Sequence, residues 1–403
     1  MNKIRVFNPE HDLALANGNR HFIAPKNIRE MARDLAPLLD VMDGEQLIVW
    51  GWDNALKKQL LRMGMAEELL PTDAALDTLR TCSARKAAHH LLRAFRTTHP
   101  DGPYTGESII THDIDTIAAY ATQHGHIILK DPLSSSGKGL RHVNENDNDN
   151  KNKNKNENEN ENDHPEGKSS SSFSSSFKKV ESWANALIKR HGYLTAEPYY
   201  NKVQDFAMEF CIRNGQCRFI GYSLFNTNHH GRYESNLLME DTQIEDLLAQ
   251  YIPHSALHEV RDWVIGHSDH IIPTEWDTTN HPLYFGIDMM IIYESQQSMD
   301  KAKINSEFKI QNSKFLLHPC VEINLRLNMG IIAHEVNRKL LAPDTRGTFH
   351  ITAFPSEEAA CLFHQEHTTK HPPLYREGKL VSGYHPLTPI LPHTRHHAYI
   401  LCE

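Results

Sequence analysis

The sequence predicts a mixed α/β and α+β protein, because short strand-like apolar runs alternate with amphipathic helical stretches along the chain. Near the start, apolar runs at residues 4–7 and 47–50 flank a stretch in which Ile28, Met31 and Leu35 fall on one helical face. This βαβ order is typical of a parallel sheet. Later strand-like runs follow one another directly, which is typical of antiparallel pairs.

From residue 83 onward the pattern mixes helices with strands. Helices are expected at residues 83–95, 114–123, 180–191, 239–251, 255–267 and 331–341. Strands are expected at residues 126–130, 193–200, 206–213, 217–225, 283–293 and 315–327. No internal repeat is visible, so the chain is not expected to be a solenoid.

Two polar segments interrupt this order. Residues 144–179 are rich in Asn, charged residues and Ser, with few large apolar side chains, so they cannot offset the entropy cost of ordering. We expect a disordered low-complexity insertion that leaves the surrounding domain intact. A segment that folds on a binding partner is the alternative. Residues 294–314 are expected to form a long hairpin connection.

Composition and charge exclude several classes of function. A formal charge of -9 repels nucleic acid, so no nucleic-acid partner is expected. No apolar run approaches the roughly 20 residues of a membrane helix, and the start lacks a secretion signal. The 6 cysteines form no CxxC pair, and the 28 histidines include no HExxH pattern, which argues against a zinc site. A cytoplasmic protein with reduced thiols is therefore expected.

One candidate anion site follows an apolar strand. That strand ends in Lys130, and the loop after it holds Ser136, Gly137, Lys138 and Gly139. Small residues let backbone N–H groups approach an anion closely, and two ammonium groups would neutralise phosphate oxygens. The spacing differs from a Walker P-loop and from GxGxxG. A polyphosphate ligand is the functional interpretation, and a turn with a solvated lysine is the alternative.

A second constellation combines acidic and amide side chains. On a strand, Glu322, Asn324 and Arg326 would share one face, because side chains alternate. Asp288 is the single charged residue in another apolar run, and a buried carboxylate is costly unless paired or bound to a metal. If the two strands pair as antiparallel neighbours, both acids can share a magnesium ion. The alternative is a solvated polar face.

These motifs resemble the ATP-grasp superfamily of carboxylate-amine and carboxylate-thiol ligases, over residues 83–337. The E-x-N-x-R strand preceded by an acid in an apolar strand is the most specific part. The resemblance implies an ATP-grasp fold: an N-terminal βαβ, Rossmann-like pre-ATP-grasp domain at residues 1–82 and a small lobe at 83–200 with the phosphate loop and the insertion. A large lobe at 201–403 would carry the metal site and a C-terminal extension.

The resemblance also implies roles for single residues. Asp288, Glu322 and Asn324 would hold Mg²⁺, or Mn²⁺ in its place, between the phosphates of ATP. Arg326 would face the reacting carboxylate or phosphoryl group, and Lys138 would close over the phosphates. The residues implied to bind the nucleotide are Lys86, Lys130, Ser136, Gly137, Gly139, Glu197, Tyr199 and Asp205. Among them, Glu197 and Tyr199 match the adenine hinge and Asp205 the ribose contact, whereas the insertion after the loop departs from the family pattern.

The implied reaction is an ATP- and Mg-dependent ligation. A small-molecule carboxylate would become an acyl phosphate, and an amine or thiol would then displace phosphate, leaving ADP and phosphate as by-products. A phosphotransferase and a non-catalytic nucleotide-binding module remain alternatives. Residues 225–236 and 8–12 are candidate substrate contacts, with a surface loop and a helix cap as the plain interpretations. The sequence indicates neither an oligomer nor the identity of the substrates.

Overall fold

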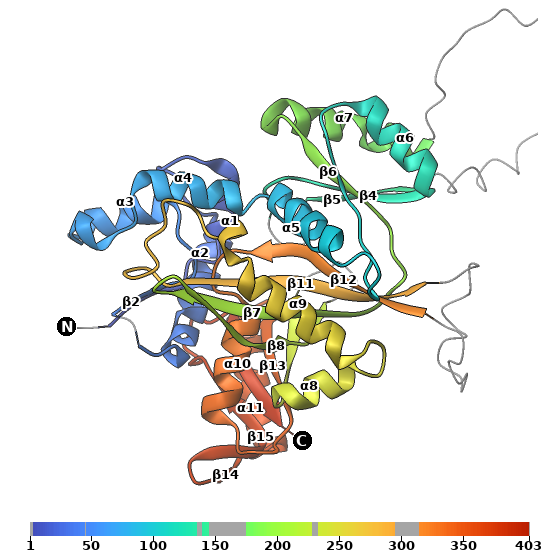
Figure 1. Cartoon of the computed structure of the whole chain (residues 1–403). Helices are drawn as coiled ribbons and strands as arrows, with labels where there is room; N and C mark the ends of the chain where they lie inside the picture. The colour runs from blue at the N-terminus through green and yellow to red at the C-terminus, as the bar shows by residue number, and fades with distance from the viewer. Residues whose placement is uncertain are drawn as a thin grey trace, which may run out of the picture. The chain divides into compact units, whose positions relative to one another are not determined.

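The computed structural model describes residues 3–44, 46–134, 139–144, 175–227, 233–294 and 314–402. The chain divides into two compact units (Figure 1). Unit 1 comprises Met1–Gly106, Leu133–Lys138 and Tyr200–Glu403, and unit 2 comprises Glu107–Pro132 and Gly139–Tyr199. Several separate sheets are combined with helices, so the expected α/β and α+β fold class is confirmed.

Unit 1 begins with a small parallel sheet. Its strands and the helices around it are β1 (Ile4–Val6), α1 (His11–Asn17), α2 (Lys26–Leu35), η1 (Ala36–Val41), β2 (Leu47–Val49), α3 (Asn54–Arg62), η2 (Glu67–Leu69) and α4 (Asp73–Cys82). β1 pairs with β2 in parallel, as the βαβ pattern predicts. Asp53 caps α3, because its carboxylate accepts hydrogen bonds from the N–H groups of Ala55 and Leu56.

A four-stranded antiparallel sheet forms the centre of unit 1, in the order β12-β11-β7-β8. Its strands are β7 (Lys202–Arg213), β8 (Gln216–Ser223), β11 (Leu283–Glu294) and β12 (Lys314–Asn324). The helices α5 (Arg85–Thr98), α8 (Asp241–Leu248) and α9 (His254–Gly266) contribute to its apolar core. Phe206, Phe210 and Phe285 lie fully buried in that core, since alternate strand residues face the helices.

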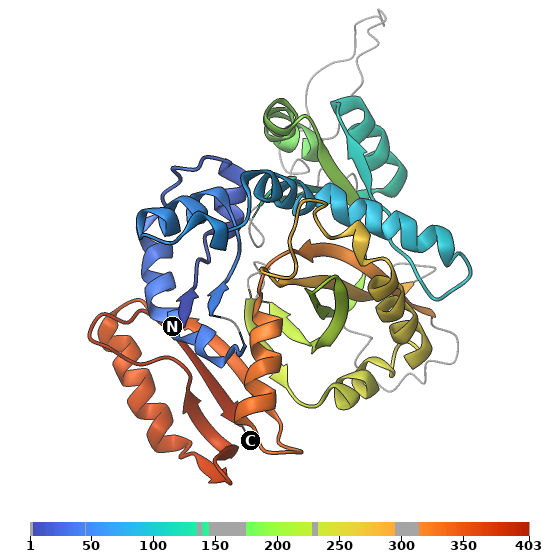
Figure 2. The ribbon, with the colours of Figure 1, turned by 60° about the vertical axis from the view of Figure 1, so that its left-hand side comes forward.

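The C-terminal part of unit 1 forms a six-stranded sheet in the order β14-β15-β16-β13-β10-β9. Its elements are β9 (Phe225–Thr227), β10 (Tyr233–Leu238), α10 (Met329–Leu340), β13 (Gly347–Ala353), α11 (Glu357–Lys370), β14 (Leu374–Arg376), β15 (Lys379–Pro386) and β16 (His396–Cys402). Leu38, Ile332 and Ile400 share one buried core, so the first and last segments of the chain pack together. Figure 2 shows the N-terminal helices in blue beside the C-terminal strands in red.

Unit 2 is an antiparallel sheet with two helices. Its elements are β3 (Ile109–Thr111), α6 (Ile114–His124), β4 (His126–Lys130), β5 (Leu140–Asn144), α7 (Ser175–His191) and β6 (Leu194–Pro198). The strands follow the order β3-β6-β4-β5. Ile127 and Leu129 of β4 are fully buried against Ile117 of α6 and Ala184 of α7. His126, Ile128 and Lys130 alternate with these two β4 residues and therefore face the other side of the sheet.

The boundaries expected for the first insertion were wrong at both ends. Asn144 belongs to β5, and α7 begins at Ser175, which the sequence analysis had assigned to the polar insertion. Phe177 and Val180 are buried at helical spacing, and this apolar contact stabilises the first turns of α7. Residues 145–174 lie outside the described residues.

The second polar segment begins and ends on paired strands. Glu294 and Lys314 are opposite each other at the ends of β11 and β12, and residues 295–313 lie outside the described residues. Within the described ranges, none of the helices is long and apolar enough to cross a membrane.

Candidate active site

Two carboxylates face each other on the central sheet of unit 1. Asp288 of β11 lies directly opposite Glu322 of β12 in the antiparallel register that the sequence analysis expected. Both side chains are half-buried. Burial, together with the negative charge of Glu322, raises the pKa of Asp288 to about 7. The pair therefore favours a cation or a proton between its oxygens.

Asn324 connects this pair to Arg326. The amide nitrogen of Asn324 donates to Oδ1 of Asp288 at 3.1 Å, and its carbonyl oxygen accepts from Nη2 of Arg326 at 3.2 Å. The expectation that Arg326 lies on the strand was wrong, because β12 ends at Asn324. The chain leaves the sheet there to begin α10, whose N-cap Asn328 accepts from the N–H of Ile331 at 3.0 Å.

The guanidinium of Arg326 is held by Asp12 of α1. Nε and Nη2 each donate to one carboxylate oxygen at 2.9 Å, and Nη1 donates to the carbonyl oxygen of Leu327 at 3.0 Å. Burial opposes ionisation of Asp12, but the charge and hydrogen bonds of Arg326 outweigh it and lower the pKa of Asp12. Asp12 belongs to the segment 8–12 that the sequence marked as a candidate. Its bidentate contact with Arg326 could not be read from the sequence.

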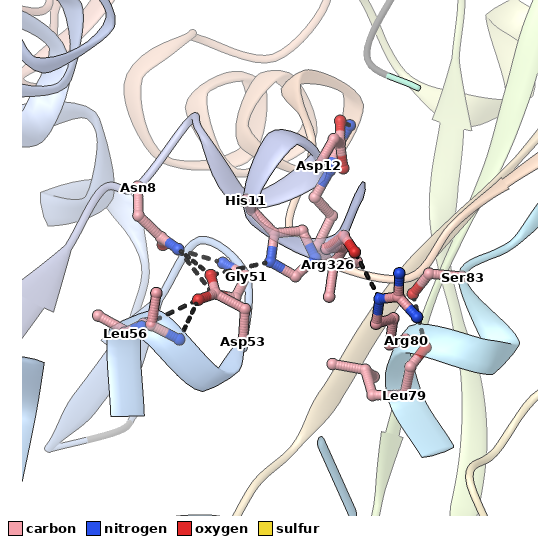
Figure 3. A network of polar contacts seen from close by, with 12 residues as sticks. Asn8, His11, Asp12, Gly51, Asp53, Leu56, Leu79, Arg80, Ser83 and Arg326 are labelled. Carbon is pink, nitrogen blue, oxygen red and sulfur yellow. Dashed lines mark hydrogen bonds and ion pairs between the residues drawn. The ribbon is translucent and has the colours of Figure 1, made fainter. Parts of the chain in front are cut away.

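Residues 8–11 pack the carboxyl ends of β1 and β2 together (Figure 3). Nδ2 of Asn8 donates to the carbonyl oxygen of Gly51 at 2.8 Å. His11 is 1% exposed, and its Nδ1 lies 3.6 Å from Oδ2 of Asp53. A Cβ on Gly51 would come within 2.4 Å of the His11 ring, so only glycine allows this approach. In segment 8–12, Asn8 and His11 therefore make structural contacts, and Asp12 contacts Arg326 of the candidate site.

Arg85, at the start of α5, was missed by the sequence analysis. Its Nη1 lies 3.2 Å from Oε2 of Glu322, so a buried cation accompanies the acid pair. The sequence analysis instead named the next residue, Lys86. Burial raises the pKa of Cys82, and the positive charge of the nearby Lys86 acts in the opposite direction. Lys86 therefore lies near the junction of α4 and α5. A basic pair at a helix start was the available signal.

Glu209 of β7 was also missed. It is 1% exposed, and its Oε2 accepts from Nδ2 of Asn328 at 2.6 Å. Burial raises the pKa of Glu209 to about 8. A Cβ on Gly330 would come within 2.1 Å of Oε1, so the carboxyl group lies tightly against the start of α10. A single acid in an apolar strand run was the signal, as it was for Asp288.

In unit 2, two of the residues expected to bind the nucleotide contact each other. Nζ of Lys130 on β4 lies 2.5 Å from Oε2 of Glu197 on β6, and both residues are buried. Tyr199 stacks on His126, with ring centroids 4.2 Å apart and planes at 11°. Unit 2 therefore offers a buried ion pair on one strand pair and an aromatic face beside it.

The remaining candidates of the nucleotide site are distributed as follows. Ser136, Gly137 and Lys138 lie outside the described residues. The carbonyl oxygen of Gly139 accepts from the N–H of Asp131 at 2.8 Å, which closes the described ends of the loop. Asp205 lies on β7 of unit 1, where it forms an ion pair with Lys202 and adds to the negative charge that raises the pKa of Asp288.

The polar segment at residues 225–236 contributes structural hydrogen bonds. Nδ2 of the buried Asn236 donates to Oγ of Ser223 at 2.7 Å, and Nδ2 of Asn226 donates to Oγ of Ser235 at 3.3 Å. Residues 228–232 lie outside the described residues. The described side chains of this segment therefore help to hold β9 and β10 in place.

The donor set around Asp288 suits a hard cation. Within the described residues, no group of three or more His, Cys, Asp or Glu side chains is arranged to hold a metal ion. Magnesium commonly takes only one or two protein carboxylates, with water and phosphate oxygens filling its other positions. The raised pKa of Asp288 marks negative charge that no nearby cation compensates fully. Asp288 and Glu322 therefore fit magnesium, whereas the Asn324 carbonyl oxygen accepts from Arg326 and the Asn324 amide nitrogen faces Asp288.

Comparison with known proteins gives distant structural similarities. No family model and no curated protein matches the chain. The chain is similar to N5-carboxyaminoimidazole synthetase from Staphylococcus aureus complexed with ADP, with a TM-score of 0.45 and 12% identity over 100% of this chain and 95% of that chain. It is similar to biotin carboxylase from Campylobacter jejuni, with a TM-score of 0.43 and 12% identity over 93% and 74% of the two chains.

A third similarity is to carboxyaminoimidazole ribonucleotide synthase from Aspergillus clavatus complexed with ATP. Its TM-score is 0.41, with 11% identity over 92% of this chain and 85% of that chain. At TM-scores below 0.5, the similarities assign neither a reaction nor a ligand to this chain.

Proposed function

We propose that the protein is an ATP-grasp ligase that joins a carboxylate to an amine, or to a thiol, at the expense of ATP. The observation that carries this proposal is the cross-strand pair Asp288–Glu322, joined through Asn324 to Arg326. Such a cluster of oxygen donors beside a guanidinium suits a phosphate-bearing substrate.

The acid pair would hold the metal–nucleotide complex. Bound there, magnesium would neutralise charge on the ATP phosphates. Asp288 has a pKa of about 7, so a large share of it is protonated at neutral pH without a cation. Cation binding would displace that proton. Arg85 would keep Glu322 oriented, since the two side chains already form an ion pair.

The nucleotide contacts in unit 2 are proposed residue by residue. The ammonium group of Lys130 would contact the phosphates, and the Glu197 carboxylate would accept a hydrogen bond from the adenine amino group. Their ion pair keeps both buried charges compensated before ATP binds. Tyr199 offers a ring face beside β4. Lys138 and its loop neighbours are proposed from the sequence alone.

The reaction would proceed in two steps, phosphorylation of the carboxylate and displacement of phosphate by the amine. An oxygen of the substrate carboxylate attacks the γ-phosphorus, the bond to the β-phosphate oxygen breaks, and ADP leaves. The amine nitrogen then attacks the acyl carbon, the carbon–oxygen bond to phosphate breaks, and the proton of the amine passes to solvent. Positioning and charge neutralisation supply the catalysis, and no protein nucleophile is required.

One incubation tests this proposal. The purified chain is mixed with ATP, magnesium and pooled carboxylates, with and without pooled amines, and ADP and phosphate release are followed. Release that needs both pools supports ligation. ADP release without phosphate release when carboxylates are present and amines are absent indicates a phosphotransferase, and ATP binding without turnover indicates a binding module.

Variants tie the activity to the acid pair. Asp288→Asn removes one charge without changing shape, and we expect it to lower metal-dependent turnover by at least about 100-fold. The control is Asp246→Asn, because Asp246 is an exposed carboxylate on α8. If Asp288→Asn and Asp246→Asn retained equal rates, the assignment of the acid pair to catalysis would be wrong.

A further inference from the structure

Unit 1 contains a cavity of about 620 Å³ along β2. Ligand pockets in proteins typically measure about 300 to 1,000 Å³, so this volume accommodates a small molecule. One wall is formed by residues 46–52, the other by residues 280–284 and by the segment 325–327 that follows β12. The cavity therefore reaches from the small parallel sheet to Arg326 at the candidate active site.

The interior of the cavity is largely apolar. The buried side chains Trp50, Trp52, Leu79 and Leu283 contribute to its walls. Trp52 also meets the His281 ring edge to face, with centroids 5.4 Å apart. Aromatic and aliphatic walls of this kind favour a ligand with an apolar, ring-bearing body, because burying that body removes apolar surface from water.

Besides the phenol of Tyr284, the titratable side chains that line the cavity are Arg326, His281 and Glu68, and among these three only Glu68 has neither a charge partner nor a neutral form at pH 7. Arg326 is compensated by the bidentate contact with Asp12. Burial lowers the pKa of His281, so its imidazole is neutral at pH 7. Glu68, in η2, makes no hydrogen bond or ion pair with any residue that the structure describes. Glu68 is exposed, so the cavity presents one negative charge that water solvates and that no described side chain pairs.

We propose that this cavity binds a small amine with an apolar, ring-bearing body, whose ammonium group pairs with Glu68. A carboxylate ligand is disfavoured, because Asp12 already occupies the paired Nε and Nη2 donors of Arg326. A neutral ligand would fill the apolar walls but leave Glu68 unpaired. Charge complementarity therefore selects the amine.

The site adjoins the candidate active site without depending on it. Arg326 lines the cavity, donates to Asn324, and Asn324 donates to Asp288, so two hydrogen bonds separate the cavity wall from the acid pair. Ligand binding requires neither ATP nor turnover. The proposal consequently stands or falls separately from the ligase assignment.

Calorimetric titration of the full chain tests the ligand class. Three probes share a phenyl ring and a short linker: 2-phenylethylamine, 2-phenylethanol and 3-phenylpropionate. We expect the amine to bind at least about tenfold more tightly than the alcohol or the acid, since a charge-assisted hydrogen bond contributes that order of affinity.

Two variants locate the binding. Glu68→Gln should weaken the amine about tenfold and leave the alcohol unchanged, because only the charge is removed. Its matched control is Glu67→Gln, a neighbouring exposed acid that does not line the cavity. Leu69→Asn should weaken the amine and the alcohol alike; Leu69 lines the cavity and is 59% exposed, so the substitution spares the buried core.

Three results would overturn the proposal. The first is an amine affinity no greater than that of the alcohol, and the second is tightest binding of the acid. The third is an equal effect of Glu68→Gln and Glu67→Gln, which would place the ammonium group elsewhere. If the amine binds as expected while the ATP assay shows no turnover, the cavity assignment stands and the proposed ligase reaction fails.

Discussion

The pKa values of three carboxyl groups in unit 1 differ because their neighbours differ. Asp12 is paired with Arg326, and its pKa is lowered. Asp288 faces a second acid, and its pKa is raised to about 7. Glu209 accepts a hydrogen bond from the amide of Asn328, and burial raises its pKa to about 8. The same side-chain chemistry thus gives an anion, a group poised at neutral pH and a largely protonated acid.

Glu209→Gln tests the protonated state of that buried acid. The pKa of Glu209 rises from 4.5 to about 8 on folding, so the unfolded chain releases this proton at a lower pH than the folded chain. Stability from this group is therefore lost as pH increases from about 4.5 to 8, by roughly 4 kcal/mol. The glutamine variant should lose that dependence, as measured by urea unfolding at pH 5 and pH 8.

The matched variant for Glu209→Gln is Glu240→Gln, which changes an exposed acid before α8. It should follow the wild-type pH dependence. A Glu209→Gln protein whose stability relative to wild type stays constant from pH 5 to pH 8 would show that Glu209 ionises normally in the folded protein.

Sequence reasoning located part of the site at the residue level. Asp288 and Glu322 were predicted as neighbours because one lone acid in an apolar run needs a partner. The same argument applies to Glu209, where no accompanying motif drew attention to it. Asp12 and Arg85 were not predicted as contacts of Arg326 and Glu322, because those contacts join distant segments of the chain.

At the scale of elements, α10 connects the candidate site to the core. Its N-cap Asn328 bonds the helix backbone with one amide atom and the buried Glu209 with the other. The helix buries Ile331 and Ile332 against the C-terminal sheet. A helix start therefore fixes the direction in which the chain leaves β12 and carries Arg326 away from the sheet.

Asn328→Ala should destabilise the protein more than loss of an ordinary cap. An N-cap is typically worth about 1 kcal/mol, and an unsatisfied buried partner adds about 1 to 3 kcal/mol. Ser356→Ala is the matched control, because Ser356 caps α11 without a buried acid. Urea unfolding of both variants should show the larger loss for Asn328→Ala. Equal losses would mean that the bond to Glu209 contributes nothing to stability.

Elements were predicted most accurately where one apolar face is long and regular. The runs that became β11 and β12 are long and mostly apolar, and the structure pairs them as expected. The end of β12 was predicted too late, because Leu325 and Leu327 continue the apolar alternation beyond Asn324. The strands β13 to β16 were not predicted, since their inward positions include His397 and Tyr384, which interrupt an apolar pattern.

At the scale of the whole molecule, the C-terminal sheet carries a buried histidine whose neutral form the fold requires. His397 is 0% exposed. Its Nε2 lies 2.6 Å from the Tyr384 hydroxyl and its Nδ1 lies 3.0 Å from the Thr388 hydroxyl. Burial lowers the pKa of His397 from 6.5 to about 4, and the nearby His364 acts in the same direction. Protonation would place a charge in the buried layer between this sheet and α11, where His364 also lies near the Tyr384 hydroxyl.

This histidine predicts loss of stability in mild acid. The unfolded chain gains a proton on His397 as pH falls below about 6.5, whereas the folded chain resists until about pH 4. Stability from this group is therefore present above pH 6.5 and is lost as pH falls towards 4, by roughly 3 kcal/mol. His397→Gln should flatten that part of the profile, as measured by unfolding free energies at pH 7 and pH 4.5.

The contributions of His397 and Glu209 to stability depend on pH with opposite signs. The histidine favours high pH and the glutamic acid favours low pH, so their effects oppose each other between about pH 4.5 and 6.5. Of these two groups, Glu209 alone continues to reduce stability above pH 6.5, and its contribution should weaken the wild-type protein up to about pH 8. His396→Gln controls for loss of a ring, because His396 is partly exposed. If His396→Gln and His397→Gln reduced the loss of unfolding free energy between pH 7 and pH 4.5 equally, burial of His397 would not be the cause of that loss.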